Sequence, residues 1–266
     1  MPHELLHFGQ VPQSRHDQLL NILAGIAGMQ PRRLIERHVI YRPQRNPVQR
    51  QYAVGASQTV QTTQRATSRE QLQKDMYYWQ TVKELDEVDL SEPTNSVDTK
   101  PHVQNGEATP EPRKGWTMLF QDIPEAGQRP INMRWIQTSD VSLGDPHAFM
   151  KASQYKYVSE YIDEGYQFVH KNAVIHLHRI LRLPNSVPGR DSPLETLPPL
   201  DKLEPLDSSG AYILQVSIKI QDNYKPETRE KATAEIMAFT NVMKGVVELG
   251  PAERLSLDTR VKAVAG

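Results

Sequence analysis

The stretch Ala211–Gln221 reads AYILQVSIKIQ, and its pattern decides the fold. Apolar side chains return at every second position, while Gln215 and Lys219 fall on the opposite face. A period of two is typical of a β-strand that has one buried and one more polar face. We therefore predict a strand whose buried face consists of Tyr212, Leu214, Val216, Ile218 and Ile220.

A second stretch, YQFVHKNAVIHLHRILRL at Tyr166–Leu183, predicts a hairpin. Phe168 and Val169 lead into a tight turn at Lys171–Asn172, and a second apolar run begins at Val174. One-sided strands joined by hairpins indicate an antiparallel sheet with one wet face, not a parallel α/β sheet. Trp116–Gln121 also alternates, and weaker cases at Leu34–Tyr41, Ile131–Gln137 and Tyr155–Tyr161 bring the strand candidates to at least seven.

Two segments show helical spacing. The first is Ser14–Ala27, which we expect Ser14 to cap and Gly28 to close. The second is Glu227–Lys244, with Pro226 at its first position. We expect its apolar stripe to pack on the buried face of Ala211–Gln221; this stripe contains Ala232, Ile236, Phe239 and Met243.

These elements predict a mainly β protein with flanking helices, namely a single barrel-like antiparallel domain over residues 1–266. We expect residues 42–73, 93–113 and 184–209 to be loop or disordered insertions. The first is rich in Gln, Thr and Arg, and the other two are rich in proline. Leucines recur every third residue in the last insertion, so it either lies along a surface or stays mobile.

Composition excludes several classes of protein. The 31 basic and 32 acidic residues leave a net charge of −1, which argues against binding nucleic acid or membranes by bulk charge. The absence of cysteine excludes disulfides and thiolate metal sites. We find no membrane-spanning apolar run and no signal peptide. We interpret the arginines between Arg42 and Arg69 as part of a solvated loop, so we expect no direct sequence-specific contact with nucleic acid.

The chain carries none of the common enzyme motifs. It has no Gly-x-Gly loop, no Walker loop, no His-Glu-x-x-His and no Gly-x-Ser-x-Gly. His176 and His178 point to one face of a strand, as in some metal sites, but no motif nominates a third ligand. We interpret the pair as half-exposed residues that share this face with Val174 and Ile180, and we expect no catalytic residue, cofactor or metal.

The first predicted helix offers a candidate partner interface. Its apolar arc is wider than one sheet requires, and Ile22 lies at the edge of this arc beside Gln18 and Gly25. An apolar side chain next to a glycine permits close approach of another subunit. The alternative is that Ile22 packs under a neighbouring loop of the same chain.

Four segments, taken in order, resemble the fungal Mediator complex subunit 18 family. They are ELLHFGQVP with HDQLLNILAGIAGMQP, GWTMLFQDIPEAG with its Asp-Ile-Pro-x-Ala-Gly turn, YQFVHKNAVIHLHRI, and VVELGPAERLSLDTRV with its Asp-x-Arg-Val ending. The likeness covers Glu4–Met29, Trp116–Leu183 and Gly210–Val261.

The resemblance implies a non-enzymatic subunit of the Mediator head module. Such a subunit is a nuclear β-barrel scaffold that couples transcription regulators to the RNA polymerase II initiation machinery. It pairs with Mediator subunit 20, is anchored by the C-terminal helix of Mediator subunit 8, and contacts other head subunits.

The competing hypothesis is an enzyme. The family's barrel is similar to that of fungal RNA 5′-triphosphatases, whose tunnel holds a metal through Glu-x-Glu pairs. This sequence contains no Glu-x-Glu. The strand interiors that we place consist of Ile, Leu, Val and Tyr, which do not bind metals. The sequence therefore favours the scaffold.

Overall fold

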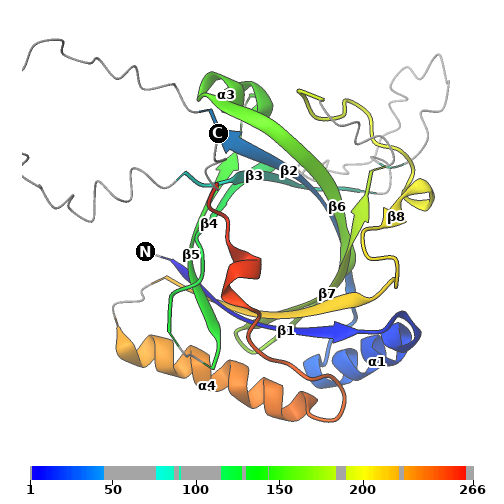
Figure 1. Ribbon diagram of the computed structural model, residues 1–266. Coiled ribbons are helices and arrows are strands. Elements are labelled where there is room, and N and C mark those ends of the chain that lie inside the picture. The colour runs from blue at the N-terminus through cyan, green and yellow to red at the C-terminus, as the bar shows by residue number, and fades with distance from the viewer. Residues whose placement is uncertain are drawn as a thin grey trace, which may run out of the picture.

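The computed structural model describes residues 2–44, 76–86, 90, 115–127, 130–142, 144–183, 190–221 and 225–261. In this part of the chain, eight strands close an antiparallel barrel in the order β6-β2-β3-β4-β5-β1-β9-β7, and β7 pairs back with β6 (Figure 1). The short strand β8 (Glu204–Pro205) pairs with the last two residues of β7. The barrel strands are β1 (His3–Val11), β2 (Arg32–Pro43), β3 (Trp79–Glu84), β4 (Trp116–Gln121), β5 (Asn132–Val141), β6 (Tyr155–His170), β7 (Ala173–Arg182) and β9 (Tyr212–Ile220).

Helices cover the outside of the barrel. The two longer helices lie below β1 in Figure 1, and the short α3 lies at the top beside β6. The stripe of α4 enters the main hydrophobic core, where Ile236 and Phe239 join the outer face of β9, as the sequence predicts. The helices are α1 (His16–Ala27), α3 (Pro146–Ala152) and α4 (Pro226–Met243), and the short 3-10 turn η1 (Gln13–Arg15) leads into α1. None of the described helices is long and apolar enough to cross a membrane.

Most of the predicted elements are present, but Tyr155–Tyr161 and the first strand of the hairpin form one continuous strand, β6. The tight turn at Lys171–Asn172 joins β6 to β7, because His170 pairs with Ala173. Gly28 ends α1 in the left-handed conformation, with φ 65°. The prediction that Ser14 caps this helix is wrong, because η1 precedes α1 and Arg15 occupies the cap without a side-chain hydrogen bond.

The elements β1, β3 and α3 have no counterpart among the predictions. In β1, Leu5 faces the outer core and the adjacent Leu6 is also fully buried, so the strand does not alternate. The strand β3 is only six residues long, and α3 only seven. The Asp145 carboxylate caps α3 by accepting a hydrogen bond of 2.9 Å from the His147 amide.

The lumen face of β9 is polar, which overturns the expectation that the interior of this strand is Ile, Leu, Val and Tyr. On β9, Gln215, Ser217 and Lys219 line an internal cavity of about 890 Å³. The strand β9 alternates as predicted, but its apolar face points out of the barrel. The physical reason is that α1 and α4 cover the outer face and hide it from water, so an apolar lining of the lumen is not needed.

The insertions differ in how far the structure describes them. Arg42 and Pro43 belong to β2, while residues 45–73 and 93–113 lie outside the described residues. Of residues 184–209, the part from 190 onward is described. It contains the 3-10 turn η3 (Leu200–Lys202), and Leu203 is buried in a second core with β6 and β7 residues, against which Leu194, Leu197 and Leu200 pack.

The C-terminal segment crosses one end of the barrel, as Figure 1 shows for the red stretch that carries the 3-10 turn η4 (Arg254–Leu257). Gly250 exchanges two backbone hydrogen bonds with Phe8 of β1, at 2.8 and 3.0 Å. Further along, the Tyr78 amide, just before β3, donates to the Thr259 carbonyl at 2.8 Å. The segment therefore links strands on opposite sides of the barrel mouth.

Candidate functional site

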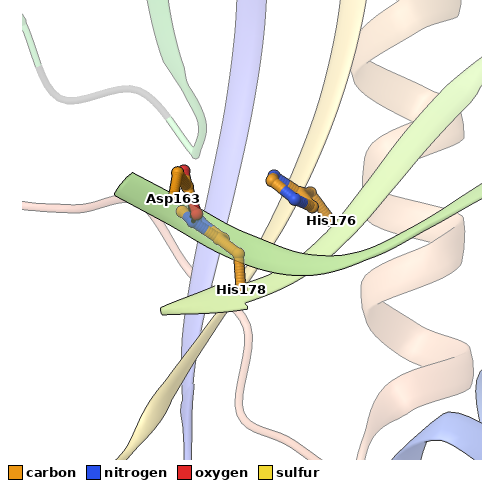
Figure 2. Close-up of side chains that lie close together, drawn as sticks. All are labelled: Asp163, His176 and His178. Atoms are coloured by element: carbon orange, nitrogen blue, oxygen red, sulfur yellow. Dashed lines mark hydrogen bonds and ion pairs between the residues drawn. The ribbon is translucent and has the colours of Figure 1, made fainter. Parts of the chain in front are cut away.

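The β6–β7 hairpin brings a carboxylate and two imidazoles together inside the barrel (Figure 2). His176 and His178 alternate with outward-facing residues on β7. Across the hairpin, His178 pairs with Gly165, so Asp163 lies two residues away on the same inner face. Register and pleat together place the three side chains in one cluster.

The geometry of this cluster is tight. The Nδ1 atom of His178 lies 2.8 Å from both carboxylate oxygens of Asp163. The rings of His176 and His178 stack with centroids 4.3 Å apart and planes 5° from parallel. One ligand atom from each of the three residues lies within 4.8 Å of the others. Chemically, the three residues have the donor atoms of a metal site. Asp163 is the third ligand that sequence reasoning missed.

Burial fixes the charges of the cluster. Burial lowers the pKa of His176 to about 4, and the charge of His178 adds to this effect, so His176 is neutral near pH 7. Burial opposes ionisation of Asp163, but the hydrogen bond and charge of His178 outweigh it and lower the pKa of this carboxyl. At neutral pH the cluster therefore presents a carboxylate beside a neutral imidazole.

A second group on β2 adjoins this cluster. Burial opposes protonation of His38, but the nearby carboxylates of Glu36 and Asp163 outweigh it and raise the pKa of this imidazole. The Nε2 atom of His38 lies 3.6 Å from Glu36 Oε2, and its ring stacks on Tyr161 at 4.8 Å. The pKa of Glu36 is lowered, because the proximity of His38 outweighs the opposing effect of burial. The lumen is therefore a set of coupled charges.

The acidic residues of the lumen do not form the pairs that a triphosphatase-like tunnel requires. The five of them, Glu4, Glu36, Glu84, Asp140 and Asp163, lie on five different strands, β1, β2, β3, β5 and β6. Four contact a basic partner; for Glu4 this is Arg134, at 2.8 Å, and for Glu84 it is Arg32, at 2.6 Å. A tunnel of this enzyme class binds its metal through two carboxylates on one strand face. The described lumen does not offer that arrangement.

The predicted interface residues lie together on α1. Gln18 and Gly25 are exposed and Ile22 is half-buried, whereas Leu19 and Leu23 enter the main core. A Cβ added at Gly25 would meet no atom of the described chain within 4 Å. Gln18 accepts a hydrogen bond of 3.3 Å from Arg15, at the start of the helix. The three residues therefore form one strip on the side of α1 that faces away from the barrel.

Sequence comparison identifies the family. The sequence profile of the Med18 protein family matches residues 3–260. The chain belongs to the Mediator subunit 18 family. A relative from Coccidioides immitis named Mediator of RNA polymerase II transcription subunit 18 is 38% identical over 266 residues, covering 98% of this chain and all of that protein. A relative of the same name from Aspergillus oryzae is 35% identical, with the same coverage.

The fold of this Mediator subunit 18 family member is also found in a solved assembly. It is similar to a chain in the structure of the Schizosaccharomyces pombe Mediator head module, with a TM-score of 0.63 and 17% identity, covering 94% of this chain and 98% of that chain. The segments on which the resemblance rested lie in β1, α1, β4, the hairpin and the C-terminal segment. In the last of these, Asp258 and Arg260 of the Asp-x-Arg-Val ending form an ion pair at 2.9 Å.

Asp163 was within reach of sequence reasoning. Extending the register from the predicted Lys171–Asn172 turn pairs Gly165 with His178, and Asp163 is then its diagonal neighbour. The distance between the side chains, and the fact that they face a lumen, depend on barrel closure. Closure involves pairing between strands far apart in the sequence, for which the local pattern gives no signal.

Proposed function

We propose that this Mediator subunit 18 family member is a non-catalytic subunit of the Mediator head module in the nucleus. In this role it is a scaffold that couples transcription regulators to RNA polymerase II initiation. The observation that carries the proposal is the match along the whole length of both chains to relatives named as this Mediator subunit. Charged groups of the lumen form ion pairs with one another, and amphipathic helices cover the outside of the barrel. Both features support a role for the chain in binding other subunits.

Its direct partners in this proposal are Mediator subunit 20 and the C-terminal helix of Mediator subunit 8, with other head subunits around them. A scaffold of this kind needs exposed surfaces that do not contribute to its own core. The strip of Gln18, Ile22 and Gly25 on α1 has this property, because the residues that hold α1 to the barrel lie on its other side. We assign this strip to contact with a head subunit.

The test is the double change Ile22→Asp with Gln18→Arg, in a pull-down of head subunits by the tagged full chain. If the strip docks a subunit, the isolated variant keeps its thermal midpoint and loses that subunit from the pull-down. The matched control is Val242→Asp on α4, an exposed apolar position away from the strip, which keeps both properties. An unchanged pull-down would remove the strip from the interface, and a collapsed midpoint would place Ile22 in the core.

The non-catalytic part of the proposal has its own assay. The purified chain, incubated with triphosphate-ended RNA and Mn²⁺, releases no phosphate above a buffer control. The physical reason is that no strand of the described barrel presents two carboxylates on its inner face. Turnover that survives repurification, and that is lost on changing lumen residues, would contradict the scaffold proposal.

A further inference from the structure

We propose that Asp163, His176 and His178 form a binding site for one divalent transition-metal ion of the zinc type inside the barrel. This inference is independent of the proposed head-module function and revises the expectation from sequence that the chain binds no metal. The donor set is two imidazoles and one carboxylate, which is a common protein contribution to zinc sites that keep one further coordination position. The position left over would face the lumen of about 890 Å³.

The first structural argument is that a buried donor atom lacks a partner. The Nε2 atom of His176 is buried and hydrogen-bonds to no group among the described residues. A buried nitrogen without a partner is costly, because it has lost its hydrogen bond to water. A metal ion satisfies such a lone pair directly. Figure 2 shows both rings projecting from one strand on the side of Asp163.

The second argument concerns the ligand atoms. The Nδ1 atom of His178 already lies 2.8 Å from both carboxylate oxygens of Asp163. An ion placed between them takes the carboxylate and this nitrogen as ligands, in place of their hydrogen bond. The stacked ring of His176, whose centroid lies 4.3 Å from that of His178, supplies the third donor.

The third argument is size. Ligand atoms about 2.1 Å from a common ion lie at most about 4.2 Å apart. The three candidate atoms lie within 4.8 Å of one another. A contraction of a few tenths of an ångström, which rotation of the side chains provides, therefore brings them into coordination range. Because the ligands come from β6 and β7, the bound ion would clamp the hairpin.

The experiment is a calorimetric titration of the full chain with Zn²⁺ at pH 7 after removal of metals by a chelator. We expect one saturable site, and a thermal midpoint that rises with Zn²⁺ concentration, because an ion that binds only the folded state stabilises it. His176→Ala and Asp163→Asn should each weaken binding by about 10–100-fold or more. His170→Asn, on β6 of the same hairpin but outside the cluster, is the matched control and should bind as the parent does.

A second measurement needs no variant and remains decisive if the variants do not fold. Imidazole ¹⁵N resonances of the unaltered chain should shift on Zn²⁺ addition at ring nitrogens of two histidines and not at those of the other seven. The absence of one-to-one binding would overturn the proposal and leave the cluster as a hydrogen-bonded network. Binding that the variants do not weaken, or shifts spread over exposed histidines, would overturn it equally.

Discussion

Phe239 and Val242 lie three residues apart on α4 but in opposite environments. Phe239 is 3% exposed and packs in the main core, whereas Val242 is 58% exposed. Phe239→Ala should therefore lower the free energy of unfolding by about 3–5 kcal/mol, the cost of a cavity in a packed core. Val242→Ala should change it by less than about 0.5 kcal/mol. Denaturant unfolding of both variants checks this, and equal midpoints would show that the phase of the helix is wrong.

His7 of β1 is a second residue whose environment gives a measurable effect. Its Nδ1 lies 2.9 Å from Thr240 Oγ1 on α4, and its Nε2 lies 2.7 Å from the Pro130 carbonyl. Burial lowers the pKa of His7, and this outweighs the opposite effect of the backbone hydrogen bond to Pro130. Since the unfolded chain then takes up the proton first, His7 reduces stability as the pH falls below about 6.5.

The corresponding variant is His7→Gln, which removes the titrating group. We expect it to be less stable than the parent near pH 7.5, because it loses the buried contacts, and this deficit should shrink as the pH falls toward 5. Unfolding free energies of both proteins over this range check the prediction, and the other histidines cancel in the comparison. A deficit that stays constant or grows on acidification would show that the pKa of His7 is not lowered.

At the scale of elements, the β6–β7 crossing depends on one glycine. A Cβ at Gly165 would lie 2.3 Å from the Leu177 carbonyl oxygen and 2.6 Å from His178 Cα, both in the backbone of the neighbouring strand. Gly165→Ala must therefore push the two strands apart, and we expect a loss of about 1–3 kcal/mol, as for other overpacked sites.

Gly25 in α1 is the matched control, because a Cβ there meets no atom of the described residues within 4 Å. Gly25→Ala should raise stability by about 0.4–1 kcal/mol, since alanine is the better helix former and restricts the unfolded chain. Thermal or denaturant unfolding of the two variants gives the comparison. The packing account of the hairpin would be contradicted if both glycine substitutions acted in the same direction.

The elements that the sequence predicts are those with a clear local period. Ala211–Gln221 alternates without a break, and the hairpin turn lies between two such runs, so β9, β6 and β7 were predictable. In β1, the adjacent Leu5 and Leu6 are both buried, on either side of the sheet, and this removes the alternation on which a prediction depends. The same reasoning explains the leucine-rich loop after residue 190, whose order comes from contacts with a finished barrel.

Contacts made only after folding also explain why this loop was ambiguous. The guanidinium of Arg37 donates to Glu160 at 3.0 Å and to the Leu194 carbonyl at 2.7 Å, on the outer surface of β2 and β6. The Leu194 amide in turn donates to Glu160 at 2.8 Å. The buried ion pair of Arg37 and Glu160 thus holds the loop backbone at Leu194. Both residues lie more than 30 positions before Leu194, so a local sequence pattern does not reveal the contact.

At the scale of the whole molecule, the barrel reverses the usual division between an apolar inside and a polar outside. Its apolar strand faces are covered by α1, α4 and the C-terminal segment, while its lumen holds ionic groups. Alternation shows that a strand has an apolar and a polar face, but it does not show which of them lines the lumen of a closed sheet. The sequence therefore predicted the two faces and placed the apolar one, wrongly, inside the barrel. The position of the helices, set by the long-range closure, decides which face is inside.

The central claim is that this Mediator subunit 18 family member acts as an assembled part of the Mediator head module. The measurement that tests it most directly is quantitative mass spectrometry of the proteins that co-purify with the tagged full chain from nuclear extract. The account predicts recovery of the head subunits, including Mediator subunits 8 and 20, in amounts close to one copy per tagged chain. Head subunits that assemble with one another while the tagged chain purifies without them would contradict it.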